Sequence, residues 1–168
     1  VVDVNNNAKN PVINSRSFGE DKVNVANKGI AYMKGMQDHY VMANAKHFPG
    51  HGDTDSDSHK SLPIINHDLE RLNDIELYPF RRMIEEGLGS MMIAHLYIPS
   101  LDSTQNQAST LSKPIVTGLL KGEMSFEGLI FTDALNMQGV SAYFEPGVVD
   151  VKALLAGNDV LLFSEDVP

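Results

Sequence analysis

Short apolar segments alternate with longer amphipathic ones along the whole chain, and no hairpin signal joins any two apolar segments. The apolar segments that we expect to form strands are 1–4, 40–45, 90–95, 128–133 and 159–163. The segments that we expect to form helices are 20–39, 68–72 (one short turn), 76–87, 112–123 and 148–156. Apolar strands that alternate with helices are typical of a parallel sheet covered by helices. The order therefore predicts an α/β fold with five parallel strands.

The length and composition fit one globular domain over residues 1–168, with 42% hydrophobic and 21% charged residues. A closed α/β barrel needs eight strands and about 250 residues. The five expected strands therefore form either a smaller open sheet or part of a barrel.

Charge and composition exclude several classes of function. The net charge is −9 and no basic run occurs, so a nucleic acid is not an expected partner. The chain has no cysteine for a disulfide or a thiolate metal site. No apolar run approaches the roughly 18 residues of a membrane span, and we expect no signal peptide within these residues. The first residue is Val1. We therefore expect a processed or truncated piece, which leaves the compartment open between the cytoplasm and the periplasm or exterior.

Polar side chains follow the expected strands at their carboxyl ends. The residues concerned are Arg16, those of the loop 46–59, His95 and Asp133. In α/β barrels and open α/β sheets, this edge carries the active site. We therefore expect these side chains to meet at one edge of the sheet.

The segment 45–59 concentrates titratable groups, with three histidines, three aspartates and one lysine. Pro49, Gly50 and Gly52 indicate a bent loop whose tight path the glycines permit. Asp57 precedes His59 by two residues, so its carboxylate could orient the imidazole for proton transfer. Taken alone, such a pair is more typical of an ordinary surface loop.

The same loop could be read as a metal site. Asp53, Asp55 and Asp57 alternate like the start of a calcium loop, but Ser58 stands where that loop needs glycine and Ile64 where it needs glutamate. His47, His51 and His59 could hold a transition metal, although their spacing matches no closed zinc pattern. A metal-dependent hydrolase stays an alternative; no metal or other cofactor is expected.

Asp133 ends a buried-looking strand, which suits a nucleophile or a metal ligand as well as a helix N-cap. Arg16 and Lys46 could clamp an anion or a hydroxyl group, or could be solvated surface charges. One carboxylate and one Asp–His pair at the same edge would be sufficient for double-displacement hydrolysis.

Two longer motifs carry a family resemblance. The segment 46–54 (KHFPGHGDT) with 57–59 (DSH) resembles the signature of glycoside hydrolase family 3, in its β-N-acetylhexosaminidase branch. The segment 131–137 (FTDALNM) is similar to the nucleophile strand of that family. Segments 2–5, 16–21, 93–95 and 156–159 fit in order. The resemblance extends from residue 1 to about residue 165.

This resemblance implies roles for six residues. Asp133 would be the nucleophile, and His59 the general acid/base oriented by Asp57. Arg16, Lys46 and His47 would hold the sugar beside the scissile bond. The implied activity is that of a retaining exo-β-N-acetylglucosaminidase acting on peptidoglycan- or chitin-derived fragments. A phosphorylase of the same family is the alternative, because a neutral imidazole repels incoming phosphate less than a carboxylate would.

The implied fold is a (β/α)8 TIM barrel of which this chain supplies roughly strands three to seven. A sugar-binding aspartate that the family carries after its second strand has no counterpart here. An incomplete barrel exposes sheet edges, so an oligomer or the remainder of a longer chain would complete it. A truncated, non-catalytic barrel fragment that serves as a binding module is the remaining alternative.

Overall fold

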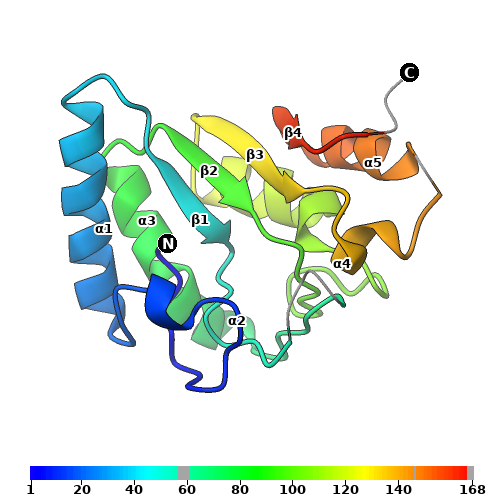
Figure 1. The fold of residues 1–168 in the computed structure, drawn as a ribbon, viewed down its shortest axis with the longest axis horizontal. Helices are drawn as coiled ribbons and strands as arrows, with labels where there is room; N and C mark the ends of the chain where they lie inside the picture. Colours follow the sequence, from blue (N-terminus) through cyan, green and yellow to red (C-terminus); the bar gives the residue numbers. More distant parts are fainter. Residues whose placement is uncertain (57–60, 146, 166–168) are drawn as a thin grey trace.

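Four parallel strands in chain order form the sheet of this computed structural model, which describes residues 1–56, 61–145 and 147–165. The strands are β1 (Asn44–Phe48), β2 (Ser90–Ile93), β3 (Leu129–Ala134) and β4 (Val160–Leu162). Each strand pairs with the next one along the chain, and all four arrows in Figure 1 point the same way. The α/β class and the parallel sheet are therefore confirmed.

Helical segments occupy the connections between the strands. The α-helices are α1 (Lys22–Gln37), α2 (Leu69–Arg71), α3 (Tyr78–Glu85), α4 (Gln138–Ser141) and α5 (Val148–Ala156). Two 3-10 helices, η1 (Asn14–Arg16) and η3 (Ser109–Leu111), and two π-helices, η2 (Leu72–Glu76) and η4 (Pro114–Glu123), complete the set in the described residues. The helices predicted at 20–39, 76–87, 112–123 and 148–156 are thus present, the third as a π-helix.

The core lies between the sheet and the helices that cover it. Figure 1 shows α1 packed beside α3 next to β1, while the segment 114–123 lies behind β2 and β3. The rings of Phe48 on β1 and Phe80 on α3 meet edge to face, with centroids 5.4 Å apart, and both are fully buried. Aromatic pairs of this kind stabilise a core beyond their buried area. This contact therefore stabilises the packing of α3 against β1.

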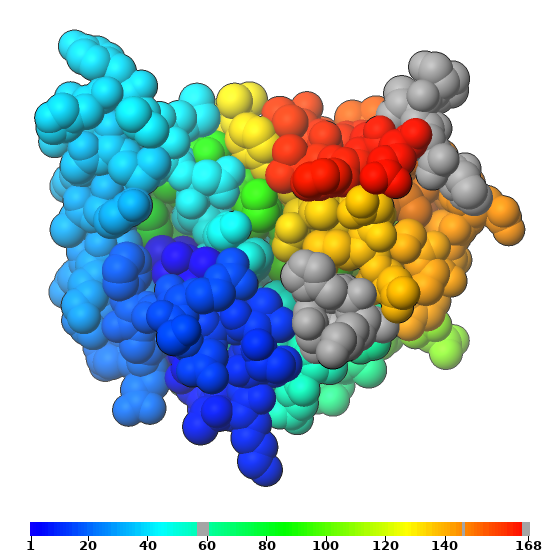
Figure 2. All heavy atoms as spheres, viewed as in Figure 1, coloured from blue at the N-terminus to red at the C-terminus, as the bar shows by residue number. Residues whose placement is uncertain are grey.

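The strand expected at 1–4 is absent, so the described part of the sheet has four strands and not five. The segment lies beside β1, where the Val2 amide donates a hydrogen bond to the Lys46 carbonyl at 2.8 Å. Its last three residues are buried, so its apolar side chains belong to the core although the segment forms no strand. In Figure 2 the blue N-terminal segment lies beside the cyan segment around β1.

The first strand of the sheet also begins later than expected, at Asn44 and not at Tyr40. Tyr40 has a positive φ of 60° and is fully exposed, and residues 38–40 form the turn out of α1. Lys46 and His47 therefore lie within β1, not on the loop that follows it. No helix in the described ranges has both the length and the apolar character needed to cross a bilayer.

Candidate active site

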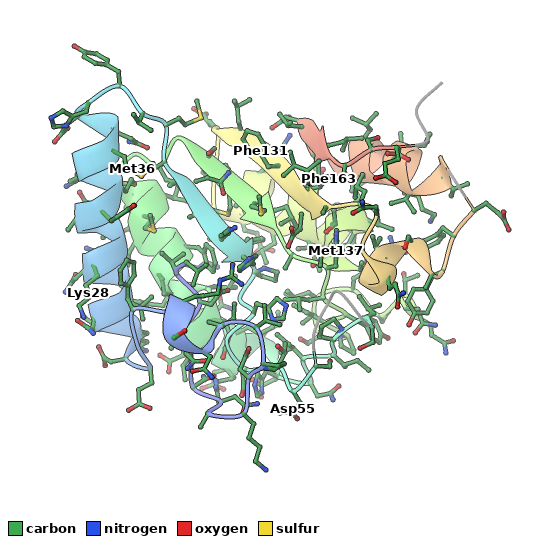
Figure 3. The ribbon with its side chains drawn as sticks, in the orientation of Figure 1. Lys28, Met36, Asp55, Phe131, Met137 and Phe163 are labelled. Atoms are coloured by element: carbon green, nitrogen blue, oxygen red, sulfur yellow. The ribbon has the colours of Figure 1, made fainter. Side chains whose placement is uncertain are left out.

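The proposed nucleophile lies at the carboxyl end of β3. Asp133 is half-buried, and its Oδ1 accepts a hydrogen bond from the Ala134 amide at 2.9 Å. Within the described residues no hydrogen bond reaches Oδ2. In Figure 3, Met137 marks the segment that leads from this strand end into α4. The backbone therefore fixes one of the two carboxylate oxygens.

A buried carboxylate that the sequence reasoning did not single out organises the end of β1. Asp3 is fully buried and binds the backbone and ring of His47 and the backbone of His51. The distances are 3.1 Å from the His47 amide to Oδ1, 2.9 Å from His47 Nδ1 to Oδ2, and 2.7 Å from the His51 amide to Oδ1. Burial alone would raise the pKa of Asp3, but the charge and hydrogen bond of His47, with the His51 amide, lower it to about 2. Asp3 is therefore ionised and fixes the orientation of His47.

Two glycines give the loop after β1 its tight path. A Cβ atom on Gly52 would lie 1.9 Å from the Val4 carbonyl oxygen. Gly50 has a φ of +129°, and a Cβ there would meet the Glu76 side chain at 2.8 Å. Only glycine fits two such approaches without moving the backbone. The role predicted for both glycines is confirmed.

Two further histidines lie around the proposed nucleophile. His51 Nδ1 is 2.8 Å from Thr54 Oγ1, and His95 is fully buried beside Ala134. Burial lowers the pKa of both rings, although the negative charge of Asp133 acts on each in the opposite sense. His95 follows β2 and contacts Ala134 at the end of β3, so His95 and Asp133 lie at the same edge of the sheet.

The three residues expected to bind the sugar lie on β1 and at the end of η1. His47 is buried and Lys46 is half-buried on β1, while Arg16 is exposed at the end of η1. The pKa of the Val1 amino group is lowered by burial and, against the charge of Asp3, by the charges of Lys46 and Arg16. Both cations therefore lie near the N-terminal segment. Asp57 and His59, the expected acid/base pair, lie outside the described residues.

A second polar cluster lies where the chain leaves the loop. His67 Nε2 is 2.6 Å from Asp53 Oδ2, and Arg71 Nη2 is 3.1 Å from Glu76 Oε1 and 3.7 Å from Asp53 Oδ2. Asp53, His67 and Glu76 could offer three ligand atoms to a metal ion. The Arg71 guanidinium already supplies positive charge there, so the cluster is best described as an ion-pair network. Asp55, labelled in Figure 3, turns instead to Asn7, whose Nδ2 donates to Oδ1 at 2.6 Å.

Sequence comparison identifies the family. The family model described as "Glycosyl hydrolase family 3 N terminal domain" matches residues 1–168. The chain belongs to glycosyl hydrolase family 3. The N-terminal domain of this family has a TIM-barrel-like α/β fold, and the four parallel strands of the chain agree with it. The assignment of the strands to positions three to seven stays a prediction.

Individual family members are similar over nearly the whole chain. Beta-hexosaminidase A of Pseudoalteromonas piscicida is 40% identical over 171 residues, which cover 96% of this chain and 29% of that protein. The solved β-N-acetylglucosaminidase of Paenibacillus sp. str. FPU-7 is 42% identical with a TM-score of 0.93, over 96% of this chain and 31% of that one. A solved structure named beta-glucoside phosphorylase BglX is 28% identical with a TM-score of 0.93, over 98% and 32%. The chain thus spans about a third of the length of these relatives.

Proposed function

We propose that the complete enzyme is a retaining exo-β-N-acetylglucosaminidase that acts on peptidoglycan- or chitin-derived fragments. The observation that supports this most is the Asp133 carboxylate at the carboxyl end of β3, with one oxygen held by the backbone. The similarity to a β-N-acetylglucosaminidase and a beta-hexosaminidase favours an N-acetylamino sugar as substrate. Arg16, Lys46 and His47 would bind its hydroxyl groups.

The reaction would proceed by two displacements at the anomeric carbon. In the first, Asp133 Oδ2 attacks that carbon, the bond to the leaving oxygen breaks, and His59 donates its proton to that oxygen. In the second, water gives a proton to His59 and attacks the same carbon, and the bond to Asp133 breaks. Asp57 would orient His59. Two inversions leave the anomeric configuration unchanged, so the first sugar released has the β configuration.

The activity is tested with the complete enzyme and p-nitrophenyl N-acetyl-β-glucosaminide. We expect release of nitrophenol, and proton NMR of the early product should show the β anomer before mutarotation. An α anomer as first product would exclude the retaining mechanism, and no turnover would exclude the proposed function. Turnover that persists in excess chelator would remove the metal-dependent alternative.

A phosphorylase is the second candidate, because the BglX structure has a TM-score of 0.93 against this chain. Phosphate would replace water in the second displacement and the product would be a sugar 1-phosphate. Turnover in phosphate buffer, followed by mass spectrometry of the products, distinguishes the two. Free N-acetylglucosamine supports the hydrolase, and N-acetylglucosamine 1-phosphate supports the phosphorylase.

The acid role of His59 gives a prediction about leaving groups. His59→Ala should lower kcat/KM much more for a chitobiose-type substrate than for the p-nitrophenyl glycoside, because nitrophenolate leaves without protonation. We expect a loss on the order of 10³-fold for the first substrate and at most about tenfold for the second. Steady-state kinetics on both substrates measure this. Equal losses would exclude His59 as the acid.

A further inference from the structure

The buried ring of His95 contacts Ala134, the residue that follows the proposed nucleophile Asp133. His95, two residues after the end of β2, is completely buried. Its Nε2 lies 2.9 Å from the carbonyl oxygen of Ala134, and the amide of Ala134 donates to Asp133 Oδ1 at 2.9 Å. A single residue, Ala134, therefore joins the ring to the carboxylate.

We propose that His95 and Thr110 are positioning residues that fix the Asp133 carboxylate for attack through Oδ2. Neither contacts the sugar in this proposal, and both act through the backbone of Ala134. The inference rests on the proposed function, because it assumes that Asp133 is the nucleophile.

The proton positions follow from the partners of the ring. The Ala134 carbonyl can only accept, so Nε2 carries a hydrogen and donates to it. Thr110 Oγ1 donates its hydrogen to the Ala94 carbonyl oxygen at 2.6 Å, and the same oxygen lies 2.7 Å from His95 Nδ1. Thr110 therefore holds the Nδ1 side of the ring, and Nε2 on the other side points to Ala134.

Thr110 is itself held from two sides. Its neighbour Ser109 donates from Oγ to the Ala94 carbonyl at 2.6 Å and accepts from the Leu96 amide at 3.1 Å. The Asn158 side-chain amide, just before β4, donates to the Thr110 carbonyl at 2.9 Å. The hydrogen-bonded network that fixes Asp133 therefore includes residues just after β2, in η3 and just before β4. Hydrogen-bonded buried networks of this kind keep a single geometry.

The consequence concerns which oxygen attacks. With Oδ1 held by the Ala134 amide, Oδ2 is the atom aimed at the anomeric carbon. If Ala134 moves, both oxygens move with it, and a displacement of about 1 Å can lower the rate about 100-fold. Loss of the His95 donor should therefore lower kcat and leave KM nearly unchanged.

The first experiment compares conservative with disruptive variants in the complete enzyme. His95→Gln keeps a donor near the position of Nε2, whereas His95→Leu removes it; Thr110→Ser keeps the hydroxyl, whereas Thr110→Val removes it. We expect His95→Leu and Thr110→Val to lower kcat about 100-fold, and the conservative variants to restore at least a tenth of the original kcat. His39→Leu, at the exposed end of α1, is the control and should leave kcat unchanged. Equal kcat in the disruptive and conservative variants, all folded by circular dichroism, would overturn the inference.

The second experiment separates positioning of Asp133 from general damage to the fold. In Asp133→Ala, added azide can replace the carboxylate and give the α-glycosyl azide. In that background the support has no nucleophile to position, so Thr110→Val and His95→Leu should cost less than about threefold in the azide-dependent rate. A further loss of about 100-fold would overturn the positioning inference while leaving the proposed function intact. No azide product at all would show that Asp133 is not the nucleophile, and both proposals would fail.

Discussion

Replacing Asp133 by asparagine is expected to lower kcat of the complete enzyme by on the order of 10⁴-fold, as removal of an essential nucleophile does in other enzymes. The amide has nearly the same shape and its oxygen can still accept the Ala134 N–H that Oδ1 accepts now. It is a very poor nucleophile, so the first displacement nearly stops. The fold should stay intact, because the backbone contact is kept.

Intact-protein mass spectrometry with a slowly hydrolysed fluorinated N-acetylglucosaminide checks this prediction. The unchanged enzyme should gain the mass of one sugar residue, and Asp133→Asn should gain none. Peptide mapping should place the label within the segment 129–134. A label on another carboxylate, or a kcat within tenfold of the original in Asp133→Asn, would contradict the assignment.

Replacing Asp3 by asparagine is expected to have the largest effect on stability, at about 3–5 kcal/mol. Asp3 is fully buried and accepts bonds from two backbone amides and one ring of the β1 end. Asparagine keeps one acceptor but loses the charge that stabilises His47 Nδ1–H. Urea unfolding of the complete enzyme measures the change, with the exposed Asp38→Asn as a control within about 0.5 kcal/mol.

The pH dependence of that difference can be stated with its sign. The pKa of Asp3 is lowered from 3.8 to about 2 in the folded protein, so its stabilising effect is complete above pH 3.8 and is lost as the pH falls towards 2. About 2 kcal/mol of the difference between the original and Asp3→Asn should therefore disappear between pH 5 and pH 2. A difference that does not change with pH would show that the lost charge is not the cause.

The later part of the fold could be predicted from local pattern alone. The segments that form β2, β3 and β4 are apolar runs bounded by glycine or polar residues, and the 148–156 helix is closed by Gly157 in the left-handed region. Because parallel strands end at a common edge, the position of Asp133 followed from the position of its strand. The sequence alone therefore predicts Asp133 as a candidate site residue.

The structure of the segment 1–4 could not be predicted in the same way, because its residues are buried although they form no strand. Val2 and Val4 pack into the core like strand residues, yet Asp3 between them is what fixes the segment to β1. A charged residue inside a short apolar run was the available signal, but its partners lie at His47 and His51, which local periodicity does not reveal. The sequence predicts His95 as a polar residue at the end of a strand, but its contact with Ala134 depends on the pairing of β2 with β3, which local sequence does not reveal.

The network of Asp53, His67 and Arg71 escaped prediction for a related reason. The spacing of Asp53 and His67 matches no motif, and the chain between them has to bend before the two side chains meet. Conversely, the acid/base assignment to Asp57 and His59 came from the family motif, and it stays a prediction that leaving-group kinetics can test.

The sequential order of the strands bears on how the chain folds as it leaves the ribosome. Each strand pairs with the one made just before it, so the sheet can grow by one strand at a time without waiting for distant segments. Asp3 likewise depends on a segment that is synthesised later, because its histidine partner is 44 residues further on. Its segment has to remain hydrated until β1 emerges, since a carboxylate buried without partners is strongly unfavourable. The contact between Asp3 and His47 can therefore form only after β1 has been synthesised.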